Sequence, residues 1–374
     1  MAERLLVNFF YAHPVGHAIE ALHYANGHHA ADPGLEVAVA LNAATPVELA
    51  GYVPSVSAAY AIRHPFLEPC PDSAPALAAV PRDWTYVADD ARRHQPSQLE
   101  LFPGMRDYYA ASDAHLRAVR RRGVAGFPPL PYAPHTPLRL ELPRAARAAA
   151  RERLDQDRPA LALMPAGGSA DRALYPSLRS WELILDALPG FQSVLVGKLR
   201  ADERSATAFG RDELAALRAH PSTPLDAFDL PLAEQLALVE ACDVFLAPHT
   251  GFGMAALAVG TPWLALSGGR WFEYFFNHVP FRSLIPDPER YGGFTQFSEP
   301  PRVDDDGPRI PAMTEARVRE DRDRIAAAAH ELAGGRVSYE DCLRDHFAAL
   351  LAAHGGDAAA IWSIDGVHRA HVGE

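Results

Sequence analysis

The chain has 374 residues, of which 48% are hydrophobic, and its formal net charge is −12. A chain of this length exceeds one comfortable hydrophobic core, so two domains are expected. The acidic balance argues against attraction to nucleic acid or an anionic membrane, and it favours a small-molecule partner. The apolar runs are strand-sized and shorter than the roughly 18 residues that cross a bilayer, so no transmembrane segment is expected.

No secretory signal opens the chain, because Glu3 and Arg4 precede an apolar strand, and this predicts a cytoplasmic protein. The three cysteines lie far apart and have no paired spacing, which argues against a zinc site or a disulfide framework. We expect reduced, partly buried thiols at these positions, which are Cys70, Cys242 and Cys342.

The first 41 residues predict a strand, a turn, a helix and a second strand, which is a unit of the Rossmann kind. Its expected elements are a strand over 4–10, a helix over 18–29 and a strand over 35–41. Residues 52–143 have little periodicity, although a helix is expected near 106–122. The many prolines of residues 128–143 predict a semi-rigid connection between domains.

The second half alternates strands and helices in lengths that predict a parallel, doubly wound sheet. Its expected elements are a helix over 144–154, a strand over 159–164, a helix over 178–188, a strand over 192–196, a strand–helix–strand unit over 243–267, and helices over 314–333 and 338–354. We expect an α/β protein with domains over 1–143 and 144–320, and C-terminal helices over 321–374 that pack back towards the N-terminal domain.

Residues 243–269 carry the most informative pattern, in which a strand ends at Ala247 and a glycine turn leads into a helix. A helix that starts at the carboxyl end of a parallel strand presents unpaired N–H groups and partial positive charge, which suit a diphosphate. His249 and Thr250 add side-chain donors. The alternative is that Gly251 and Gly253 only permit tight packing between strand and helix.

Two further strand ends carry glycine, hydroxyl or cationic groups, at residues 164–169 and 196–198. Three such ends converge on one crevice of a parallel sheet, where ligands bind in this architecture. In order and spacing these segments resemble the C-terminal half of the bacterial lipopolysaccharide heptosyltransferases. The resemblance is carried by Pro165-Ala166-Gly167-Gly168-Ser169, Gly197-Lys198, His249-Thr250-Gly251-Phe252-Gly253-Met254 and Ala258-Val259-Gly260-Thr261-Pro262.

This resemblance covers roughly residues 160–270 and implies the GT-B fold, in which two Rossmann-like domains face each other across a cleft. It implies that a nucleotide-diphosphate sugar is bound by Gly16, Pro165, Gly167, Gly168, Ser169, Lys198, His249, Thr250, Gly251, Phe252, Gly253 and Met254. The sequence departs from the family at His249, where the family has aspartate, and at Met254, where it has histidine. A histidine at the first position is similar to the antibiotic and plant glycosyltransferases, where it contacts the diphosphate.

A sugar transfer with inversion needs a base that takes the proton of the acceptor hydroxyl. Gly16 and His17 begin the first helix, where heptosyltransferases have a Gly-Asp pair whose aspartate is the base and antibiotic-type enzymes have Gly-His. His17 is therefore the candidate base, since its unperturbed pKa near 6.5 lets it accept a proton at neutral pH. His13 is the rival base. The alternative is that His17 only occupies the first helical turn.

A neighbouring carboxylate would hold the tautomer of His17, but no residue is identified for this role, and Glu20 reads as a helix-face residue. The run Asp304–Asp306 reads as a solvated loop rather than a metal site. Residues 155–157 have the Asp-x-Asp spacing of a metal-binding motif, but we predict that they lie at the end of a helix. The aromatic cluster over 271–276 has three possible roles: it stacks on the base of a nucleotide, lines the path of the acceptor or packs between the domains.

We therefore predict an inverting, metal-independent glycosyltransferase without a cofactor, which moves a hexose or heptose to an acceptor hydroxyl. Its role would lie in secondary-metabolite or cell-surface glycan biosynthesis, and the protein would be a monomer or a weak homo-oligomer. One alternative is a nucleotide-sugar epimerase on the same fold, although its chemistry needs carboxylates that the turns lack. The other is a non-catalytic protein that binds a nucleotide sugar.

Overall fold

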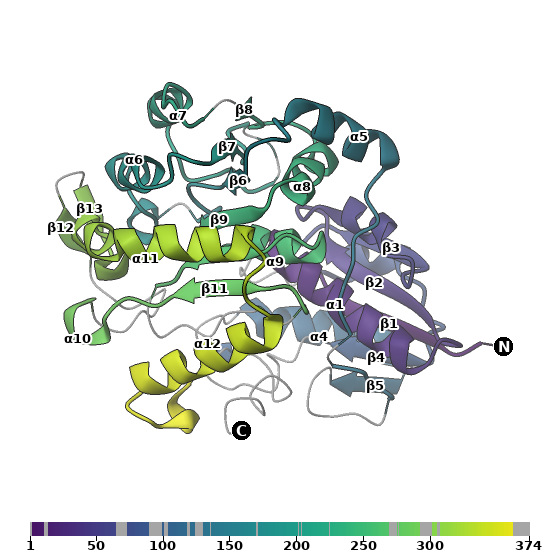
Figure 1. The fold of residues 1–374 in the computed structure, drawn as a ribbon. Coiled ribbons are helices and arrows are strands. Elements are labelled where there is room, and N and C mark those ends of the chain that lie inside the picture. The colour runs from purple at the N-terminus through teal and green to yellow at the C-terminus, as the bar shows by residue number, and fades with distance from the viewer. Residues whose placement is uncertain are drawn as a thin grey trace. The chain divides into compact units, whose positions relative to one another are not determined.

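The computed structural model describes residues 2–10, 14–64, 73–89, 99–100, 104–117, 120–123, 130–134, 136–169, 171–200, 202, 204–223, 225–268, 275, 277–291, 301–304 and 307–361 (Figure 1). The chain divides after Glu141, so that unit 1 begins at the N-terminus and unit 2 runs from Leu142 to Trp362. The predicted boundary at residue 143 lies two residues beyond this division.

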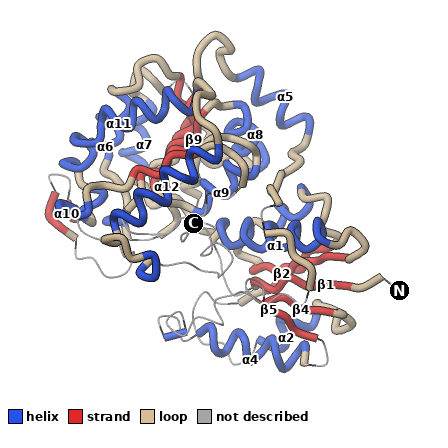
Figure 2. The backbone as a smooth tube through the Cα atoms, turned by 60° about the horizontal axis from the view of Figure 1, so that its bottom comes forward, coloured by secondary structure: helices blue, strands red, loops and turns tan. Residues whose placement is uncertain are grey.

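Unit 1 is a parallel five-stranded sheet in the order β3-β2-β1-β4-β5. Its strands are β1 (Arg4–Phe9), β2 (Glu36–Asn42), β3 (Ala58–Ile62), β4 (Tyr86–Asp89) and β5 (Arg120–Gly123). Figure 2 shows α1 on one face of this sheet and α2 and α4 on the other. The helices are α1 (Val15–Ala31), α2 (Ser73–Ala76) and α4 (Gly104–Leu116), with short 3₁₀ turns at Val47–Tyr52 and Leu77–Ala79.

Two predicted helices of unit 1 have different limits in the structure. The first begins three residues early, at Val15, because Pro14 caps it in an extended conformation and Gly16 is accommodated in its first turn. The second was expected over 106–122 but ends at Leu116, and residues 120–123 pair with β4 as an edge strand. The pairing with β4 overrides the local preference for a helix. Periodicity in the sequence cannot predict this pairing.

Unit 2 is a parallel six-stranded sheet in the order β11-β10-β9-β6-β7-β8. Figure 1 shows α6 and α11 on one side of this sheet and α8 and α9 on the other. Its strands are β6 (Ala160–Leu163), β7 (Gln192–Leu195), β8 (Leu225–Asp226), β9 (Val244–Pro248), β10 (Trp263–Leu266) and β11 (Phe281–Leu284).

The helices of unit 2 follow the predicted pattern closely. They are α5 (Arg144–Arg153), α6 (Leu178–Asp186), α7 (Arg211–Arg218), α8 (Leu232–Ala241), α9 (Gly251–Ala258), α10 (Pro288–Tyr291), α11 (Glu315–Ala333) and α12 (Tyr339–Ala353), with 3₁₀ turns at Arg172–Leu174, Pro311–Met313 and Ala358–Ala360. The prediction that residues 155–157 form a helix exit is confirmed, since α5 ends at Arg153. The two parallel sheets and their helices confirm an α/β protein with two Rossmann-like units.

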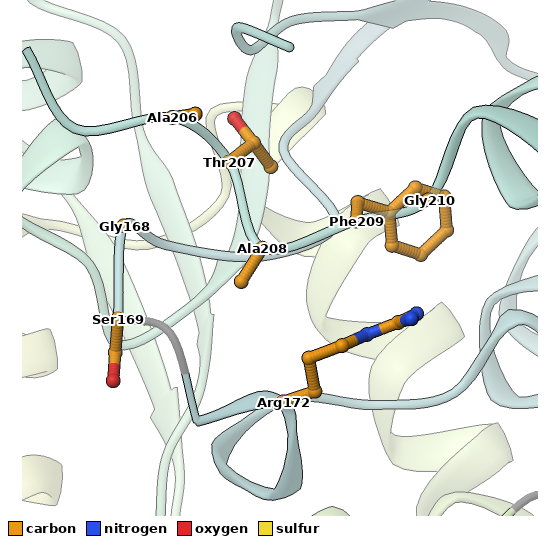
Figure 3. A pocket seen from close by; sticks show the side chains of 8 residues that line it. All are labelled: Gly168, Ser169, Arg172, Ala206, Thr207, Ala208, Phe209 and Gly210. Carbon is orange, nitrogen blue, oxygen red and sulfur yellow. The ribbon is translucent and has the colours of Figure 1, made fainter. Parts of the chain in front are cut away.

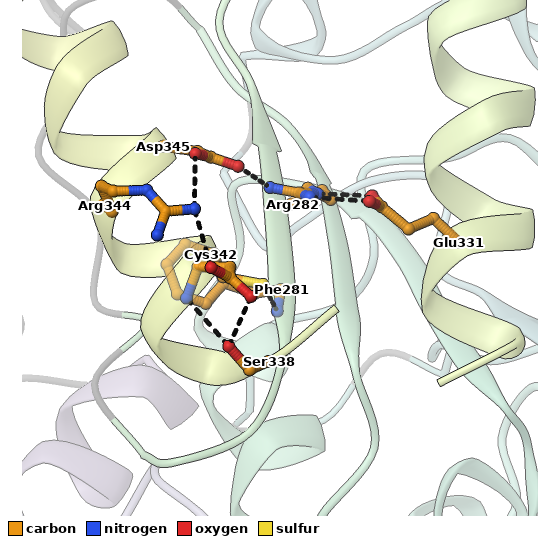
Figure 4. A network of polar contacts seen from close by, with 8 residues as sticks. Phe281, Arg282, Glu331, Ser338, Cys342, Arg344 and Asp345 are labelled. Carbon is orange, nitrogen blue, oxygen red and sulfur yellow. Dashed lines mark hydrogen bonds and ion pairs between the residues drawn. The ribbon is translucent and has the colours of Figure 1, made fainter. Parts of the chain in front are cut away.

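The C-terminal helices α11 and α12 belong to unit 2 and pack on its sheet, and the prediction that they are directed towards the N-terminal domain stays a prediction. Arg282 of β11 donates to Glu331 of α11 at 2.7 and 2.9 Å and to Asp345 of α12 at 2.8 Å (Figure 4). Hydrogen bonding to Glu331 raises the pKa of Arg282, so the guanidinium stays charged. The last residues of that predicted segment, 362–374, lie outside the described residues.

We expect Arg282→Gln to lower the free energy of unfolding by about 1–2 kcal/mol, because it removes three charge-assisted hydrogen bonds to two carboxylates from a side chain that is 18% exposed. Arg344→Gln is the matched control, since Arg344 pairs with Asp341 at 2.7 Å but its side chain is 69% exposed. We expect the control to change stability by less than about 0.5 kcal/mol. Equal urea midpoints for the two variants would contradict this account of the network.

The described part of the proline-rich connection, which was predicted to be semi-rigid, packs on α1 within unit 1. The Pro131 carbonyl lies 2.9 Å from Nδ1 of His28, and the Pro137 carbonyl accepts from Asn26 at 3.1 Å. Gly27 permits the approach, because an added Cβ would lie 2.5 Å from the Tyr132 ring. Burial lowers the pKa of His28, which favours the neutral imidazole at this contact.

Other predicted features fall partly within the described residues. Cys242 and Cys342 are buried and form no disulfide, and Cys70 lies outside the described residues. Residues 302–304 and 307–309 form the hairpin strands β12 (Arg302–Asp304) and β13 (Gly307–Arg309), so Asp304 belongs to a strand and not to the predicted loop. Within the described part of the chain, no helix is long and apolar enough to span a bilayer.

Candidate functional site

The carboxyl ends of β6 and β9 form the centre of the candidate site in unit 2. Read from β8, the strand order is the 3-2-1-4-5-6 order of a dinucleotide-binding sheet, whose direction of winding reverses between β6 and β9. Leu163 pairs with Leu246, and the next amide, that of Met164, donates to the Leu246 carbonyl at 3.0 Å. The predicted segments 164–169 and 248–253 therefore leave the sheet side by side.

The two loops approach each other closely at Gly167. A Cβ at this position would lie 2.8 Å from the Tyr175 hydroxyl and 3.2 Å from Cγ2 of Thr250. The same hydroxyl accepts the backbone N–H of Ser169 at 3.1 Å, and burial raises the pKa of Tyr175, so that it stays protonated. Only glycine allows this approach, and the loop after β6 is thereby held against the start of α9.

Thr250 caps α9 in an extended conformation, with φ −142° and ψ 149°, but its side chain makes no capping hydrogen bond. The residue is 6% exposed, and among the described residues its hydroxyl has no hydrogen-bond partner. A threonine at this position normally bonds to an N–H of the first turn, and that turn leaves several N–H groups without helical partners. The start of α9 thus combines an unused buried hydroxyl with the positive end of a helix.

The remaining predicted residues around α9 differ in their surroundings. At Gly253 an added Cβ would lie 2.2 Å from the Trp263 ring, so the absence of a side chain lets α9 pack on β10. Phe252 is buried against Phe245, with ring centroids 5.6 Å apart. His249 is half-buried, as is Met254. Tight packing therefore accounts for Gly253, and donor contacts by these residues stay predictions.

Lys198 follows β7, but its ammonium group is engaged by an ion pair with Asp202. Hydrogen bonding from Lys198 lowers the pKa of Asp202, so the carboxylate is ionised at neutral pH. The backbone at Gly197 is held by the buried amide of Gln235, which accepts the Gly197 N–H at 3.0 Å and donates to its carbonyl at 3.1 Å. The third predicted strand end therefore has a backbone held by Gln235 and an ion-paired cation.

A pocket of about 430 Å³ opens beside the loop after β6 (Figure 3). Its lining combines two loop segments that are more than thirty residues apart in sequence, namely Gly168, Ser169, Arg172, Ala206, Thr207, Ala208, Phe209 and Gly210. Gly168 and Ser169 were predicted from the sequence, whereas the segment over 206–210 was not. That segment has no periodic or motif signal. It joins the site through the Ala208 N–H, which donates to the Gly167 carbonyl at 2.9 Å.

In unit 1 the predicted base lies at the corresponding reversal of strand order, beside the central strand β1. His17 is in the first turn of α1, with its side chain 27% exposed, and Nδ1 lies 3.0 Å from a carboxylate oxygen of Glu20. Glu20 is thus the carboxylate that contacts His17, although it was predicted to be a helix-face residue, and its spacing of three residues on a helix was the available signal. Gly16 is buried in the same turn, and His13 lies outside the described residues.

The comparisons with known proteins identify the fold. No family model matches the sequence, and no curated protein matches it. The structure is similar to a glycosyl transferase family 9 protein of Veillonella parvula, which is 13% identical, with 87% of this chain and 98% of that chain covered at a TM-score of 0.57. It is also similar to the ADP-heptose lipopolysaccharide heptosyltransferase II of E. coli, which is 16% identical, with 87% and 98% covered at a TM-score of 0.52. The fold is thus heptosyltransferase-like over most of the chain, as the resemblance predicted.

Proposed function

We propose that the protein is a glycosyltransferase that binds the diphosphate of a nucleotide sugar at the start of α9. The observation that carries the proposal is the meeting of Gly167 and Thr250 at the reversal of strand order in unit 2, with an unused buried hydroxyl and a helix start in one place. The likeness to an ADP-heptose transferase supports a nucleoside diphosphate-heptose or hexose as donor.

His17 is proposed as the base of an inverting displacement. The contact with Glu20 favours a hydrogen on Nδ1, which places the accepting lone pair on Nε2. Nε2 takes the proton of the acceptor hydroxyl as that oxygen bonds to the anomeric carbon from the face opposite the diphosphate. The bond between the anomeric carbon and the diphosphate oxygen breaks, and the electron pair leaves on the nucleoside diphosphate.

The leaving diphosphate gains negative charge as this bond breaks. The N–H groups at the start of α9 and the Thr250 hydroxyl are suited to stabilise that charge, and we propose that they do so without a metal ion. An epimerase would need carboxylates around the sugar, whereas none of the described residues that line the pocket beside this site carries one. The acceptor is proposed to be a hydroxyl of a small molecule or a glycan.

The test is binding of nucleoside diphosphates by the purified protein. We expect one of UDP, GDP, ADP, CDP and dTDP to raise the melting temperature in the presence of EDTA, because a ligand of the folded state stabilises it. Thr250→Val should weaken that nucleotide about tenfold, since it removes a hydrogen bond to a charged group.

Thr223→Val is the matched control for this experiment. Thr223 is 8% exposed, and its hydroxyl also lacks a partner among the described residues, but it precedes β8 at the opposite edge of the sheet. We expect nucleotide affinity within twofold of wild type in this variant. If none of the five nucleotides bound, or if both variants bound equally well, the proposed donor site would be wrong.

A further inference from the structure

Polar side chains are buried at the carboxyl ends of the three central strands of unit 1. Asn8 is the next-to-last residue of β1, Asn42 is the last residue of β2, and Asp89 is the last residue of β4. Their exposed fractions are 0%, 2% and 1%, and every other buried residue of these strands is apolar. Burial of amides and carboxyl groups lowers stability unless they are hydrogen-bonded, so their concentration at one end of the sheet calls for a reason. The helix that carries His17 begins at this end of β1.

The end of β1 is held from the side of α4. Tyr108 of α4 donates its hydroxyl hydrogen to the Asn8 carbonyl at 2.7 Å. The Asn8 side chain donates to the Asp89 carboxyl group at 2.9 Å and to the Ser112 hydroxyl at 2.7 Å. Figure 2 shows α4 on the face of the sheet opposite α1. The backbone and side chain of Asn8 are therefore fixed on the face that lies away from His17.

Asn42 holds the chain where β1 ends. Its amide nitrogen donates to the Phe10 carbonyl and to the His64 carbonyl, each at 2.8 Å, and its oxygen accepts the Ala44 N–H at 2.9 Å. The amide thus uses both of its N–H groups and its oxygen. An ionised aspartate has the same shape but cannot donate, so only the amide can hold the two carbonyls in this way.

The held segment is joined to the first turn of α1 by a short link. Residues 11–13, which lie outside the described residues, separate Phe10 from Pro14, and the His17 N–H donates to the Pro14 carbonyl at 3.1 Å. Four steps of 3.8 Å between Cα atoms span at most roughly 15 Å. The position of Phe10 therefore limits where α1 can begin and where His17 lies.

We propose that Tyr108 and Asn42 are positioning residues for His17. By holding the carbonyls of Asn8 and Phe10, they set the place from which the imidazole meets the acceptor hydroxyl. The inference rests on the proposed function, since it takes His17 as the base. The competing explanation is that these buried groups only stabilise the sheet of unit 1, in which case their loss would lower stability without acting through His17.

The first readout is the rate of donor turnover in Tyr108→Phe and Asn42→Asp, alone and combined with His17→Ala. The probe is the glucose conjugate of whichever of the five nucleotides raises the melting temperature. We expect each substitution to lower kcat about tenfold, because a small displacement of a base slows proton transfer. The KM for the donor should stay within twofold, since the proposed donor contacts lie in unit 2.

The combination with His17→Ala separates positioning from a loss of folded protein. If Tyr108 and Asn42 act through His17, their substitution should lower the remaining rate of His17→Ala by less than twofold. A variant that merely contains less folded protein would lose the same fraction of its rate in both backgrounds. Melting curves establish that each variant is folded. Tyr108→Phe keeps the buried ring and serves as the test if Asn42→Asp does not fold.

The second readout needs no substrate. The ring C–H resonances of His17 in NMR spectra, assigned by their absence from His17→Ala, report the surroundings of the imidazole. We expect Tyr108→Phe and Asn42→Asp to shift these resonances, because the first turn of α1 is displaced. This readout decides the inference if the glucose conjugate is not turned over.

Two controls carry the same substitutions elsewhere in unit 1. Asn26→Asp changes an amide that donates to the Pro137 carbonyl at 3.1 Å and accepts from Ser55 at 3.0 Å. Tyr86→Phe removes a hydroxyl that contacts Glu3 at 3.1 Å, at the amino end of β4. Both controls should keep kcat within twofold of wild type and leave the His17 resonances in place.

The inference and the proposed function fail separately. His17 resonances that stay unchanged in Tyr108→Phe and Asn42→Asp, or equal fractional losses of rate with and without His17, would overturn the inference while nucleotide binding and the effect of His17→Ala still support the proposed function. Shifted His17 resonances in a protein that binds none of the five nucleotides would support the positioning of His17 and contradict the proposed function.

Discussion

His17→Ala is expected to lower the rate of sugar transfer about 10²- to 10⁴-fold while leaving nucleotide affinity within twofold of wild type. The loss is the contribution typical of a positioned general base, and affinity is retained because His17 belongs to unit 1 while the proposed diphosphate contacts lie in unit 2. The measurement is release of the nucleoside diphosphate from its nucleotide sugar, with water or a candidate acceptor, alongside nucleotide binding by thermal shift.

His29→Ala is the control, because His29 lies in the last turn of the same helix. We expect its rate within twofold of wild type. Glu20→Gln should give an intermediate loss of roughly tenfold, since the amide still contacts Nδ1 of His17 but stabilises the imidazolium less well. A His17→Ala variant that turns over at the wild-type rate would exclude His17 as the base.

Gly253→Ala is expected to destabilise unit 2 by about 3 kcal/mol or more. An added Cβ would lie 2.2–2.4 Å from three atoms of the Trp263 ring, and this ring is fully buried, so it has no room to move. Gly190→Ala is the matched control, because no atom lies within 4 Å of the added Cβ there. The measurement is the urea unfolding midpoint of each of the two variants.

A second substitution separates the collision from other effects of removing the glycine. Trp263→Leu shortens the ring that the new methyl group meets, so the double variant should lose less stability than the sum of the two single changes. The coupling is expected to exceed about 1 kcal/mol in favour of the double variant. Additive losses, or a Gly253→Ala midpoint equal to that of Gly190→Ala, would show that α9 has room to move away from β10.

Local patterns in the sequence determined the type and approximate limits of most elements of unit 2. The strand at 244–248, its glycine turn and the helix ending near Gly260 were predicted from apolar runs and glycine positions, because these features act within a few residues of themselves. The position of His17 at the start of a helix was predicted for the same reason, and Glu20 could have been paired with it by its spacing of three residues.

The convergence of the loops that follow 164 and 248 was predicted from the sequence, but only the tertiary structure showed the specific contacts. Pairing of β6 with β9 brings Gly167 against Thr250, and the loop over 206–210 completes a pocket with Arg172. The same holds for residues 120–123, which became a strand by pairing with β4. The physical reason is that contacts between distant segments depend on strand register and on the packing of whole helices. Register and packing are set by the sum of many interactions across the unit, and no single motif encodes them.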